Sequence, residues 1–487
     1  MINKTLKHSI WILLFSVFTL STMAQKKAGH ILRFNPDKTF KIAQFTDVHW
    51  DDNATNCKET EATFKMVIET EKPDLILLTG DIVTYDPAKK GWLSIAKIME
   101  GSGIPWAVLL GNHDDEMELT REAIFRLLEP LPNFIGESGP ENISGVGNYV
   151  LPIVSAASGS PGALIYCLDS HAYPKDKKLG NYDWIKFDQL EWYRGKSTKY
   201  TISNGGNPLP ALAYFHIPIP EIEKAYGTKS TTGIKNESNG SSDINSGLLA
   251  TFIDMKDVMG VFSGHDHENN YIGKVSEIAL GYGQVTGSNA YGSFDRGSRI
   301  VELREGERAF NTWIRTGKGV FYQYNYPFGF SFETEANYLP AVAASTPKQG
   351  IRYSYFECKI KSADELSALK PQKQGTMAGI SLKPKTSADD FGIEFSGLIK
   401  IPAKGIYRFY TYSDDGSKLY IDGQEVVNND GSHSGKREDG IIALDEGFHS
   451  FTLLYFEDCM GESLELGFSS VKIPETILPD KLLYYQE

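Results

Sequence analysis

The chain has 487 residues, of which 41% are hydrophobic and 23% charged, and its formal net charge is -13. This composition is that of an ordinary globular protein long enough for two or three domains. The acidic balance disfavours nonspecific binding to nucleic acid or to anionic membranes, and no nucleic-acid-binding surface is evident.

The first residues have the pattern of a secretory signal peptide. Lys4 and Lys7 precede the apolar run 10–20, and small residues follow at 22–24. The apolar run is too short for a membrane-spanning helix, and no later segment reaches spanning length. We expect cleavage after residue 24, a secreted or periplasmic protein without a membrane span, and a charge that changes from -13 to about -15 with the loss of two lysines.

Short polar blocks close a series of apolar runs in the first 270 residues. They are Asp47 with His49, Gly80-Asp81, Gly111-Asn112-His113-Asp114, His216, and Gly264-His265 with His267. Each run has the length and composition of a buried strand, and strands placed in this way direct their carboxyl ends at one crevice. Five of the ten histidines of the chain fall in these blocks.

The residue types in these blocks indicate metal binding. Aspartate, asparagine and imidazole suit Zn, Fe or Mn, and no cysteine is near enough to suggest a structural thiolate site. A single Gly-Asp pair or strand-end histidine is more often a turn or a satisfied polar residue. The ordered occurrence of all the blocks reverses that expectation and predicts a two-metal hydrolytic centre.

The ordered blocks resemble the signature of the calcineurin-like metallophosphoesterases, which runs D-x-H, G-D, G-N-H-D/E, H and G-H-x-H. The resemblance covers about residues 40 to 300. The text YFHIPIPE around His216 and LDSHAY around Asp169 is similar to the branch with purple-acid-phosphatase-29 and the Dcr2-like phosphatases. The resemblance implies an α/β fold in which a layered metallophosphoesterase β-sandwich is flanked by helices.

The same resemblance implies a role for each block. The first metal ion would be held by Asp47, His49, Asp81 and His267. The second would be held by Asp81, Asn112, His216 and His265, so that Asp81 bridges the two ions. Two such ions, of Mn, Zn or Fe, lower the pKa of a shared water and clamp the attacking and leaving oxygens.

The expected reaction is direct hydrolysis of a phosphate ester by a metal-bridging hydroxide, without a phosphoenzyme. A small phosphomonoester is the favoured substrate, and a phosphodiesterase or nucleotidase of the same fold is the alternative. His113 would act on the substrate, and Asp114 would orient it through the other ring nitrogen. Asp114 is equally compatible with capping a helix in 116–130.

One position departs from the coloured purple acid phosphatases. Their tyrosine ligand lies three residues beyond the Gly-Asp aspartate, where this chain has Thr84, and Tyr85 is one place too far. His49 fills that coordination position instead. We therefore expect a colourless or weakly coloured centre.

Two loops could contribute to substrate binding. The first, 281–299, offers four candidate residues: Tyr282, Asn289, Tyr291 and Arg296. A plain hairpin with surface aromatics is the alternative for this loop, and the alternative is favoured. The second, 227–247, is polar and rich in Gly, Ser and Asn. We expect it to be a mobile loop beside the site, either a lid or a disordered insertion.

The four cysteines are Cys57, Cys167, Cys358 and Cys459. They are widely spaced and form no C-x-x-C pair, which argues against a disulfide scaffold. One bridge in each half and buried free thiols are both compatible with this spacing.

From about residue 350 the sequence changes to short alternating strands separated by Gly, Asp and Asn turns, which predicts an all-β sandwich. Residues 350–475 resemble the PA14 module. Some lectin-like members hold Ca and a glycan with an adjacent aspartate pair, and Asp414-Asp415 occupies that position here, although most PA14 modules keep the pair as part of a turn.

The predicted organisation has four segments. They are a signal peptide over 1–24, a metallophosphoesterase domain over 25–330, a linker over 331–349 and a PA14-like β-sandwich domain over 350–487. The alternative from another functional class is a surface protein that binds carbohydrate through the PA14-like part. All the expected metal ligands are in place, which argues against a decayed metal centre.

Overall fold

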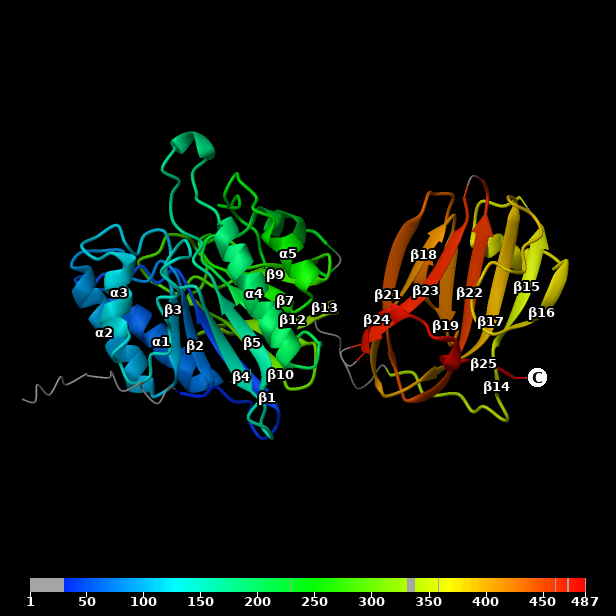
Figure 1. Ribbon diagram of the computed structural model, residues 1–487, viewed down its shortest axis with the longest axis horizontal. Coiled ribbons are helices and arrows are strands. Elements are labelled where there is room, and N and C mark those ends of the chain that lie inside the picture. The colour runs from blue at the N-terminus through cyan, green and yellow to red at the C-terminus, as the bar shows by residue number, and fades with distance from the viewer. Residues whose placement is uncertain are drawn as a thin grey trace, which may run out of the picture.

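The structure is a computed structural model that describes residues 30–228, 230–330, 338–357, 359–459, 461–470 and 473–486. Figure 1 shows an α/β part followed by an all-β part. The predicted signal peptide and residues 331–337 of the predicted linker lie outside the described residues. Among the helices of the described residues, none is both long enough and apolar enough to span a membrane.

The first sheet of the α/β part has the strand order β13-β12-β11-β10-β1-β2-β3. Strands β1, β2 and β3 are parallel, and β10 runs antiparallel to β1. The strands are β1 (Thr39–Phe45), β2 (Leu75–Thr79), β3 (Trp106–Leu109), β10 (Gly297–Arg304), β11 (Phe310–Thr316), β12 (Gly319–Tyr326) and β13 (Gly329–Phe330).

The second sheet has the order β4-β5-β6-β7-β9-β8. Strands β5, β6, β7 and β9 are parallel, and the edge strands β4 and β8 are antiparallel to their neighbours. The strands are β4 (Tyr149–Val154), β5 (Pro161–Cys167), β6 (Ala211–Tyr214), β7 (Val258–Ser263), β8 (Ile272–Val275) and β9 (Ile278–Tyr282). Each apolar run that precedes a predicted polar block is therefore a strand, as expected.

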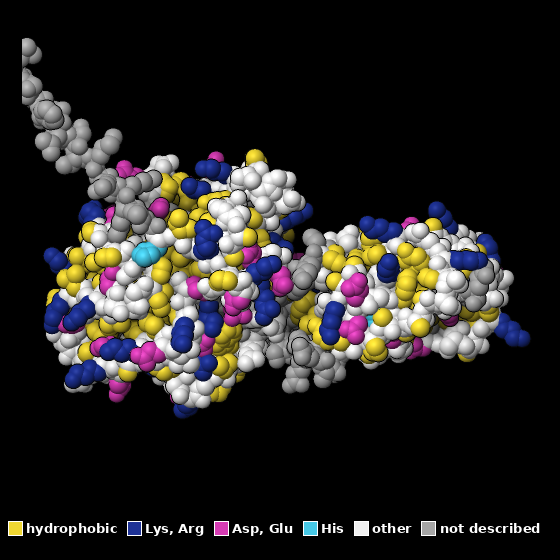
Figure 2. All heavy atoms as spheres, turned by 90° about the horizontal axis from the view of Figure 1, so that it is seen from below, with side chains coloured by type: hydrophobic (Ala, Val, Ile, Leu, Met, Phe, Trp, Pro, Cys, Tyr) yellow, Lys and Arg dark blue, Asp and Glu magenta, His cyan; other side chains and the backbone are white. Residues whose placement is uncertain are grey.

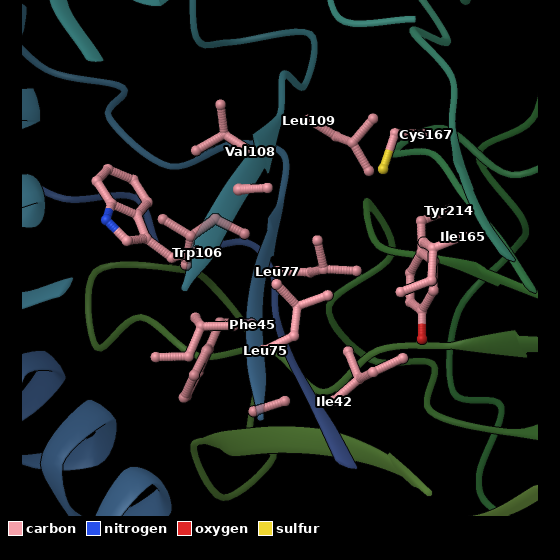
Figure 3. Close-up of a cluster of buried hydrophobic side chains, with 14 of the residues drawn as sticks. Ile42, Phe45, Leu75, Leu77, Trp106, Val108, Leu109, Ile165, Cys167 and Tyr214 are labelled. Carbon is pink, nitrogen blue, oxygen red and sulfur yellow. The ribbon is translucent and has the colours of Figure 1, made fainter. Parts of the chain in front are cut away.

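One hydrophobic core joins the two sheets. Ile42 of β1 and Leu77 of β2 belong to the same buried cluster as Ile165 of β5 and Tyr214 of β6 (Figure 3). Strand β2 is buried along its whole length, as expected for a parallel strand that is covered on both faces. Because this core fixes both sheets, the ends of their strands are fixed relative to one another.

Helices cover the outer faces of the sheets. They are α1 (Cys57–Glu71), α2 (Ala88–Ser102), α3 (Arg121–Leu128), α4 (Phe187–Ser203) and α5 (Leu248–Met255), with short 3₁₀ turns η1 (Lys177–Leu179) and η2 (Pro220–Ala225). On the first sheet, the ring of Phe64 in α1 packs edge-on against Phe45, with centroids 4.7 Å apart. On the second sheet, Tyr193 of α4 packs at 4.9 Å against Tyr166 of β5. The result is the predicted layered fold.

The all-β part has two sheets. One has the order β14-β25-β17-β22-β19-β20, with β15 beside β17 and β16 beside β15, and the other has the order β21-β18-β23-β24. The strands of the first are β14 (Lys348–Gln349), β15 (Ile351–Glu357), β16 (Lys373–Met377), β17 (Phe391–Ile401), β19 (Ser417–Ile421), β20 (Gln424–Asn429), β22 (Gly447–Glu457) and β25 (Leu483–Tyr485). Those of the second are β18 (Gly405–Asp414), β21 (Lys436–Leu444), β23 (Ser463–Ser470) and β24 (Ile473–Ile477), and 3₁₀ turns occur at η3 (Ala363–Ala368) and η4 (Asp480–Leu482).

This part has a core of its own, as the alternating pattern predicts. Buried Phe395 of β17 and Leu453 of β22 come from one sheet, and buried Phe409 of β18 and Phe468 of β23 come from the other. The pairs of strands in each sheet are antiparallel. The part is therefore an all-β sandwich.

An ion pair connects the two parts of the chain. Arg408 of β18 is 4% exposed at its side chain, and its Nη2 lies 2.6 Å from Glu277 Oε2 in the turn between β8 and β9. Elsewhere the surface charges are mixed: on the face shown in Figure 2, basic and acidic side chains are interspersed.

Candidate metal centre

The strand ends of both sheets bring two groups of possible ligands together. One group is Asp47, His49 and His267, and the other is Asp81, His216 and His265. Within each group the ligand atoms lie within 4.8 Å of one another. Asn112 lies beside the second group, because the backbone N–H of the next residue, His113, donates to Asp81 Oδ1 at 2.9 Å.

Asp81 lies between the two groups. Its Oδ2 is 3.2 Å from His216 Nε2 and 3.9 Å from His49 Nε2. In the other group, His267 Nε2 is 3.4 Å from Asp47 Oδ1 and 3.2 Å from His49 Nε2. Two imidazole nitrogens so close together, beside a carboxylate, form a donor set that suits a borderline metal ion.

The backbone is strained at several of these positions. Asp47, His49, Asp81 and His265 have φ values of 53°, 45°, 53° and 80°. Residues other than glycine rarely adopt such values, and each instance costs on the order of 1 kcal/mol or more. The sharp turns that follow the strands point these side chains into the centre, so the strain lies where the chemistry is expected.

The glycines of the motifs permit close approach. A Cβ atom at Gly80 would lie 2.2 Å from His216 Nδ1, and one at Gly111 would lie 2.1 Å from Asp81 Oδ1. Neither contact is sterically possible, and Gly80 also has a φ of 93°. The Gly-Asp and Gly-Asn-His-Asp motifs therefore need glycine for packing as well as for turning.

Several buried polar atoms fit a pair of metal ions. Among the described residues, Asn112 Oδ1 and His265 Nδ1 are buried and have no hydrogen-bond partner, and the buried His216 Nε2 faces only the Asp81 carboxylate, at 3.2 Å. The other ring nitrogen of His216, Nδ1, lies 2.9 Å from the backbone carbonyl of Thr79 and can donate to it. With Nδ1 engaged in this bond, Nε2 is the ring nitrogen that faces Asp81 and that would bind a metal ion.

The electrostatics of the centre favour positive charge between the aspartates. Burial lowers the pKa of His49 to about 4 and, with the neighbouring His216, lowers that of His265 to about 3. Burial also opposes the charged form of His216, but Asp81 and Asp47 outweigh it and raise the pKa to about 9. Neutral imidazoles and ionised carboxylates are the forms in which these groups bind metal.

The predicted partnership between Asp114 and His113 is wrong. Asp114 is fully buried, and its carboxylate accepts the backbone N–H groups of Asp81, Ile82, Val83 and Gly111 at 2.7 to 3.0 Å. His113 Nδ1 instead lies 2.7 Å from Glu116 Oε2. Asp114 therefore holds the Gly-Asp turn against the Gly-Asn-His-Asp turn.

The alternative role for Asp114, capping a helix, is also wrong. Helix α3 begins at Arg121, and its N-cap is Thr120, whose side chain accepts from the backbone N–H of Ala123.

Asp169, near the crevice, forms an ion pair with Arg121, whose Nη1 lies 2.9 Å from Asp169 Oδ1.

Two of the four substrate-binding candidates have structural partners instead. Tyr282 is fully buried, and its hydroxyl donates to Asp266 Oδ2 at 2.5 Å. Arg296 donates to backbone carbonyls of its own loop, including that of Ala290 at 2.6 Å. The prediction of substrate contact is wrong for Tyr282, because β9 directs its side chain into the core. For Arg296 it stays a prediction, although the loop folds around this side chain.

The other two candidates lie at the metal centre. The ring of Tyr291 stacks on that of His267, with centroids 3.9 Å apart and an interplanar angle of 24°. Its hydroxyl donates to Glu237 at 2.9 Å. Asn289 donates to the backbone carbonyl of His49 at 3.1 Å, so it supports the first motif.

The polar segment 227–247 is attached to the fold along its described residues. Isolated β-bridges join Thr232 to Ile272 and Lys235 to Asn269. The amide of Asn239 donates to the hydroxyls of Tyr271 and Tyr282 at 2.7 and 2.6 Å. Polar side chains therefore attach this segment to the fold in place of apolar anchors, and its mobility and its role as a lid stay predictions.

Two aromatic residues at the site were missed by sequence reasoning. Tyr173 accepts a hydrogen bond from Asn112 Nδ2 at 3.0 Å, and Tyr182 packs edge-on against His265 at 4.4 Å. Both flank the short turn η1, which inserts between β5 and α4. The motif LDSHAY pointed to this segment but gave no reason to choose its tyrosine.

A third group of carboxylates lies in the all-β part. Ligand atoms of Asp414, Asp415 and Glu457 come within 4.8 Å of one another. Glu457 is 1% exposed and its Oε1 has no hydrogen-bond partner, while Asp415 accepts backbone N–H groups of His433 and Asp458 at 2.7 and 2.8 Å. Burial, followed by the charges of Asp415 and Asp414, raises the pKa of Glu457 to about 7. Glu457 was not a predicted site residue.

The cysteines described by the structure, Cys57, Cys167 and Cys459, are free thiols. Cys167 is buried, and burial raises the pKa of its thiol to about 12. Cys358 lies outside the described residues.

Comparison with known proteins identifies both parts of the chain. Residues 40–269 match the calcineurin-like phosphoesterase family, and residues 347–477 match the PA14 domain family. A relative from Arabidopsis thaliana, "Probable inactive purple acid phosphatase 29", is 34% identical over 350 residues, which cover 64% of this chain and 90% of the relative.

Phosphatase DCR2 from Saccharomyces cerevisiae is 31% identical over 316 residues, covering 57% of this chain and 53% of that protein. A solved dimetal phosphatase from Danio rerio is 11% identical, with 59% of this chain and 98% of that chain covered and a TM-score of 0.43. The Arabidopsis and Saccharomyces relatives confirm the resemblance to the purple-acid-phosphatase and Dcr2 branch. The chain belongs to the calcineurin-like phosphoesterase family and has a PA14 domain in its C-terminal part.

Proposed function

We propose that this protein is a dinuclear-metal phosphoesterase that acts outside the cytosol and hydrolyses small phosphate esters, with phosphomonoesters preferred. The observation that carries the proposal is the convergence of two ligand groups around Asp81, with Asn112 Oδ1 and His265 Nδ1 buried and lacking hydrogen-bond partners. The predicted signal peptide and the predicted limits 25–330 and 350–487 belong to the same proposal.

The proposed first ion is held by Asp47, His49, Asp81 and His267, and the second by Asp81, Asn112, His216 and His265. When bound, such ions lower the pKa of a water and neutralise charge on the phosphate. The Arabidopsis relative has "inactive" in its name, and the proposal for this chain is supported by two groups of side chains that could each hold a metal ion.

The protein's own groups have separate tasks in this proposal. His113 lies beside the ligands, with its ring centroid 5.9 Å from that of His49, and it is partly exposed. An imidazole in this position can give a proton to the oxygen that leaves phosphorus. Burial of the ligand side chains excludes water from the rest of the centre and strengthens their field.

The test is hydrolysis of p-nitrophenyl phosphate and bis-p-nitrophenyl phosphate by protein loaded with Mn, Zn or Fe. Asp81→Asn and His265→Ala should each lower kcat by about a thousandfold or more, because each removes a metal ligand. Asp254→Asn, an exposed acid on α5, is the matched control and should keep full activity. A wild-type protein that is inactive with every metal would contradict the proposal.

A second candidate function is cation-dependent carbohydrate binding by the PA14 domain. The supporting observation is the acidic group Asp414, Asp415 and Glu457, in which Asp415 and Glu457 are buried and Glu457 Oε1 has no partner. Oxygen ligands of this kind suit Ca²⁺. The proposed ligand is a carbohydrate whose hydroxyls complete the coordination of the cation.

Calcium titration calorimetry on the full-length protein tests this second function. Glu457→Gln should abolish the heat of calcium binding. Glu446→Gln, which changes an exposed acid in the same domain, should retain this heat. If Asp81→Asn retains the heat of calcium binding, the calcium site lies in the PA14 domain. Binding to a panel of oligosaccharides that requires added calcium would support the carbohydrate part, and binding that persists in chelator would contradict it.

A further inference from the structure

We propose that Glu116 and Tyr173 are positioning residues that connect the imidazole of His113 to the metal-ligand side chain of Asn112. The inference rests on the proposed function and deepens it, because it names the groups that aim the proton donor. It follows from a continuous chain of hydrogen bonds, His113 to Glu116 to Tyr173 to Asn112, with distances of 2.7, 3.0 and 3.0 Å.

Glu116 controls which nitrogen of His113 faces the substrate. Its Oε2 lies 2.7 Å from Nδ1 of the imidazole, so Nδ1–H can donate to the carboxylate. With Nδ1 engaged, Nε2 is the ring nitrogen left to meet a substrate oxygen. A carboxylate behind a histidine fixes both its tautomer and its orientation.

The neighbouring acids are committed to other partners. Asp114 accepts backbone N–H groups, including that of Gly111 at 2.7 Å. Asp115 pairs with Arg121 Nη2 at 3.3 Å. Among these consecutive acids, the carboxylate on His113 is therefore that of Glu116.

Tyr173 joins the proton donor to the metal ligand. Its hydroxyl donates to Glu116 Oε1 and accepts from Asn112 Nδ2, both at 3.0 Å. Because the Nδ2 group of Asn112 is used in this way, its amide is oriented with Oδ1 as the free acceptor, and Oδ1 is buried without a partner. The phenol thus sets the face that Asn112 presents to a metal ion.

The chemistry gives these contacts a specific effect. In hydrolysis, the oxygen of water forms a bond to phosphorus, the ester P–O bond breaks, and the departing oxygen takes a proton from His113 Nε2. Water releases a proton to solvent, from which His113 is protonated again. Proton donation matters most for a strongly basic leaving oxygen and little for p-nitrophenolate.

The experiment compares glycerol 2-phosphate, an alkyl ester, with p-nitrophenyl phosphate on the full-length protein loaded with Mn. Glu116→Gln should lower kcat for the alkyl ester by about 10- to 100-fold, with KM unchanged, and kcat for the p-nitrophenyl ester by about threefold or less. Glu122→Gln, an exposed acid on α3, is the matched control and should leave both substrates unaffected.

A double-mutant cycle then tests whether Glu116 acts through His113. In a His113→Gln background, Glu116→Gln should cause no further loss on either substrate. Tyr173→Phe should show the same leaving-group effect and also weaken Mn binding by about tenfold in a metal titration, since it releases Asn112. Glu116→Gln should keep the metal content of the wild type.

The activity of the wild type tests the proposed function, and the activity of Glu116→Gln on the two esters tests the role of Glu116. An active wild type with equal losses on both esters in Glu116→Gln, or with losses that add to those of His113→Gln, would overturn the inference alone. A wild type that hydrolyses neither ester with any metal would overturn the proposed function and the inference together.

Discussion

At the scale of single residues, the metal centre combines burial with incomplete hydrogen bonding. Asn112 Oδ1 and His265 Nδ1 are buried without hydrogen-bond partners, a condition that costs on the order of 1 to 3 kcal/mol per group. A metal ion removes that cost. The left-handed backbone of Asp47 and Asp81 adds strain at the same place, which is typical of functional sites.

Tyr291 should support metal binding through its ring. Because this ring stacks on His267 at 3.9 Å, Tyr291→Ala should weaken Mn binding by about tenfold in a metal titration. Tyr291→Phe keeps the stack and loses the hydroxyl that bonds Glu237, so it should bind Mn like the wild type. Equal weakening in both variants would contradict the role of the ring.

The iron-loaded protein should have no intense tyrosinate absorption band. Thr84 stands at the sequence position of the tyrosine ligand of the coloured enzymes, and its Oγ1 lies 3.2 Å from His49 Nδ1. We predict that a visible spectrum of the Fe-loaded protein lacks the charge-transfer band. A strong tyrosinate-to-iron charge-transfer band in the visible spectrum would show that another tyrosine binds the iron.

At the scale of elements, side chains from one loop hold the start of another helix. The carboxylate of Glu118 accepts the backbone N–H groups of Ala88 and Lys89, both at 2.9 Å, at the N-terminus of α2. This cap joins the segment after the Gly-Asn-His-Asp motif to the helix after the Gly-Asp motif. Packing of the two motifs is therefore linked to the stability of α2.

Glu118→Gln should destabilise the protein by about 0.5 to 1 kcal/mol at pH 7, because it weakens an exposed cap. The bonds to Lys89 and Ala88 lower the pKa of Glu118 to about 2 from the ordinary 4.5. The stabilisation that ionised Glu118 gives to the folded protein is thus complete above about pH 4.5 and is lost as the pH falls toward 2.

The difference in free energy of unfolding between Glu118→Gln and wild type should therefore shrink between pH 5 and pH 3. Urea denaturation at several pH values measures it. Glu69→Gln on α1 is the control and should show no such dependence. A constant difference across this range would contradict the capping role.

At the scale of the whole molecule, the two parts have separate cores and are joined by the contact between Arg408 and Glu277. The metal ligands lie in the α/β part, and the acidic group lies in the PA14 domain. Ligand binding stabilises only the structure that holds the ligand. The two parts should therefore respond differently to metal removal.

Calorimetry should show two unfolding transitions. Removal of the Mn ions with a chelator should lower the midpoint of the phosphoesterase transition, since occupancy at 100 times Kd contributes about 2.7 kcal/mol. The PA14 transition should respond to calcium instead, and Glu457→Gln should abolish that response. A single transition that shifts as a whole would contradict the independence of the two parts.

Much of this architecture could be predicted from the sequence. The apolar runs around residues 42–45 and 75–79 are strands because continuous burial demands apolar residues, and the polar blocks follow them. The two-residue turn Asp422-Gly423 lies between β19 and β20, with positive φ at both positions, as a hairpin turn requires. Local pattern and tertiary structure agree at these places.

Long-range contacts could not be predicted in the same way. Tyr173 reaches Asn112 across 61 residues of sequence, and Asn239 reaches Tyr282 across 43. Tyr282 was a candidate for substrate contact or for a surface aromatic of a hairpin, but the register of β9 beside β7 turns it into the core. Such contacts depend on how the sheets pack, which no local pattern contains.

The sequence by itself determined the family, the strands and the set of possible metal ligands, because a metal centre restricts both residue type and spacing. Only the tertiary structure decided which acid serves which neighbour. In the run Asp114-Asp115-Glu116, three similar side chains bind a backbone turn, an arginine and a histidine. The partner of a carboxylate is set by turn geometry and by the donors that surround it in space, and both arise only when the chain is folded.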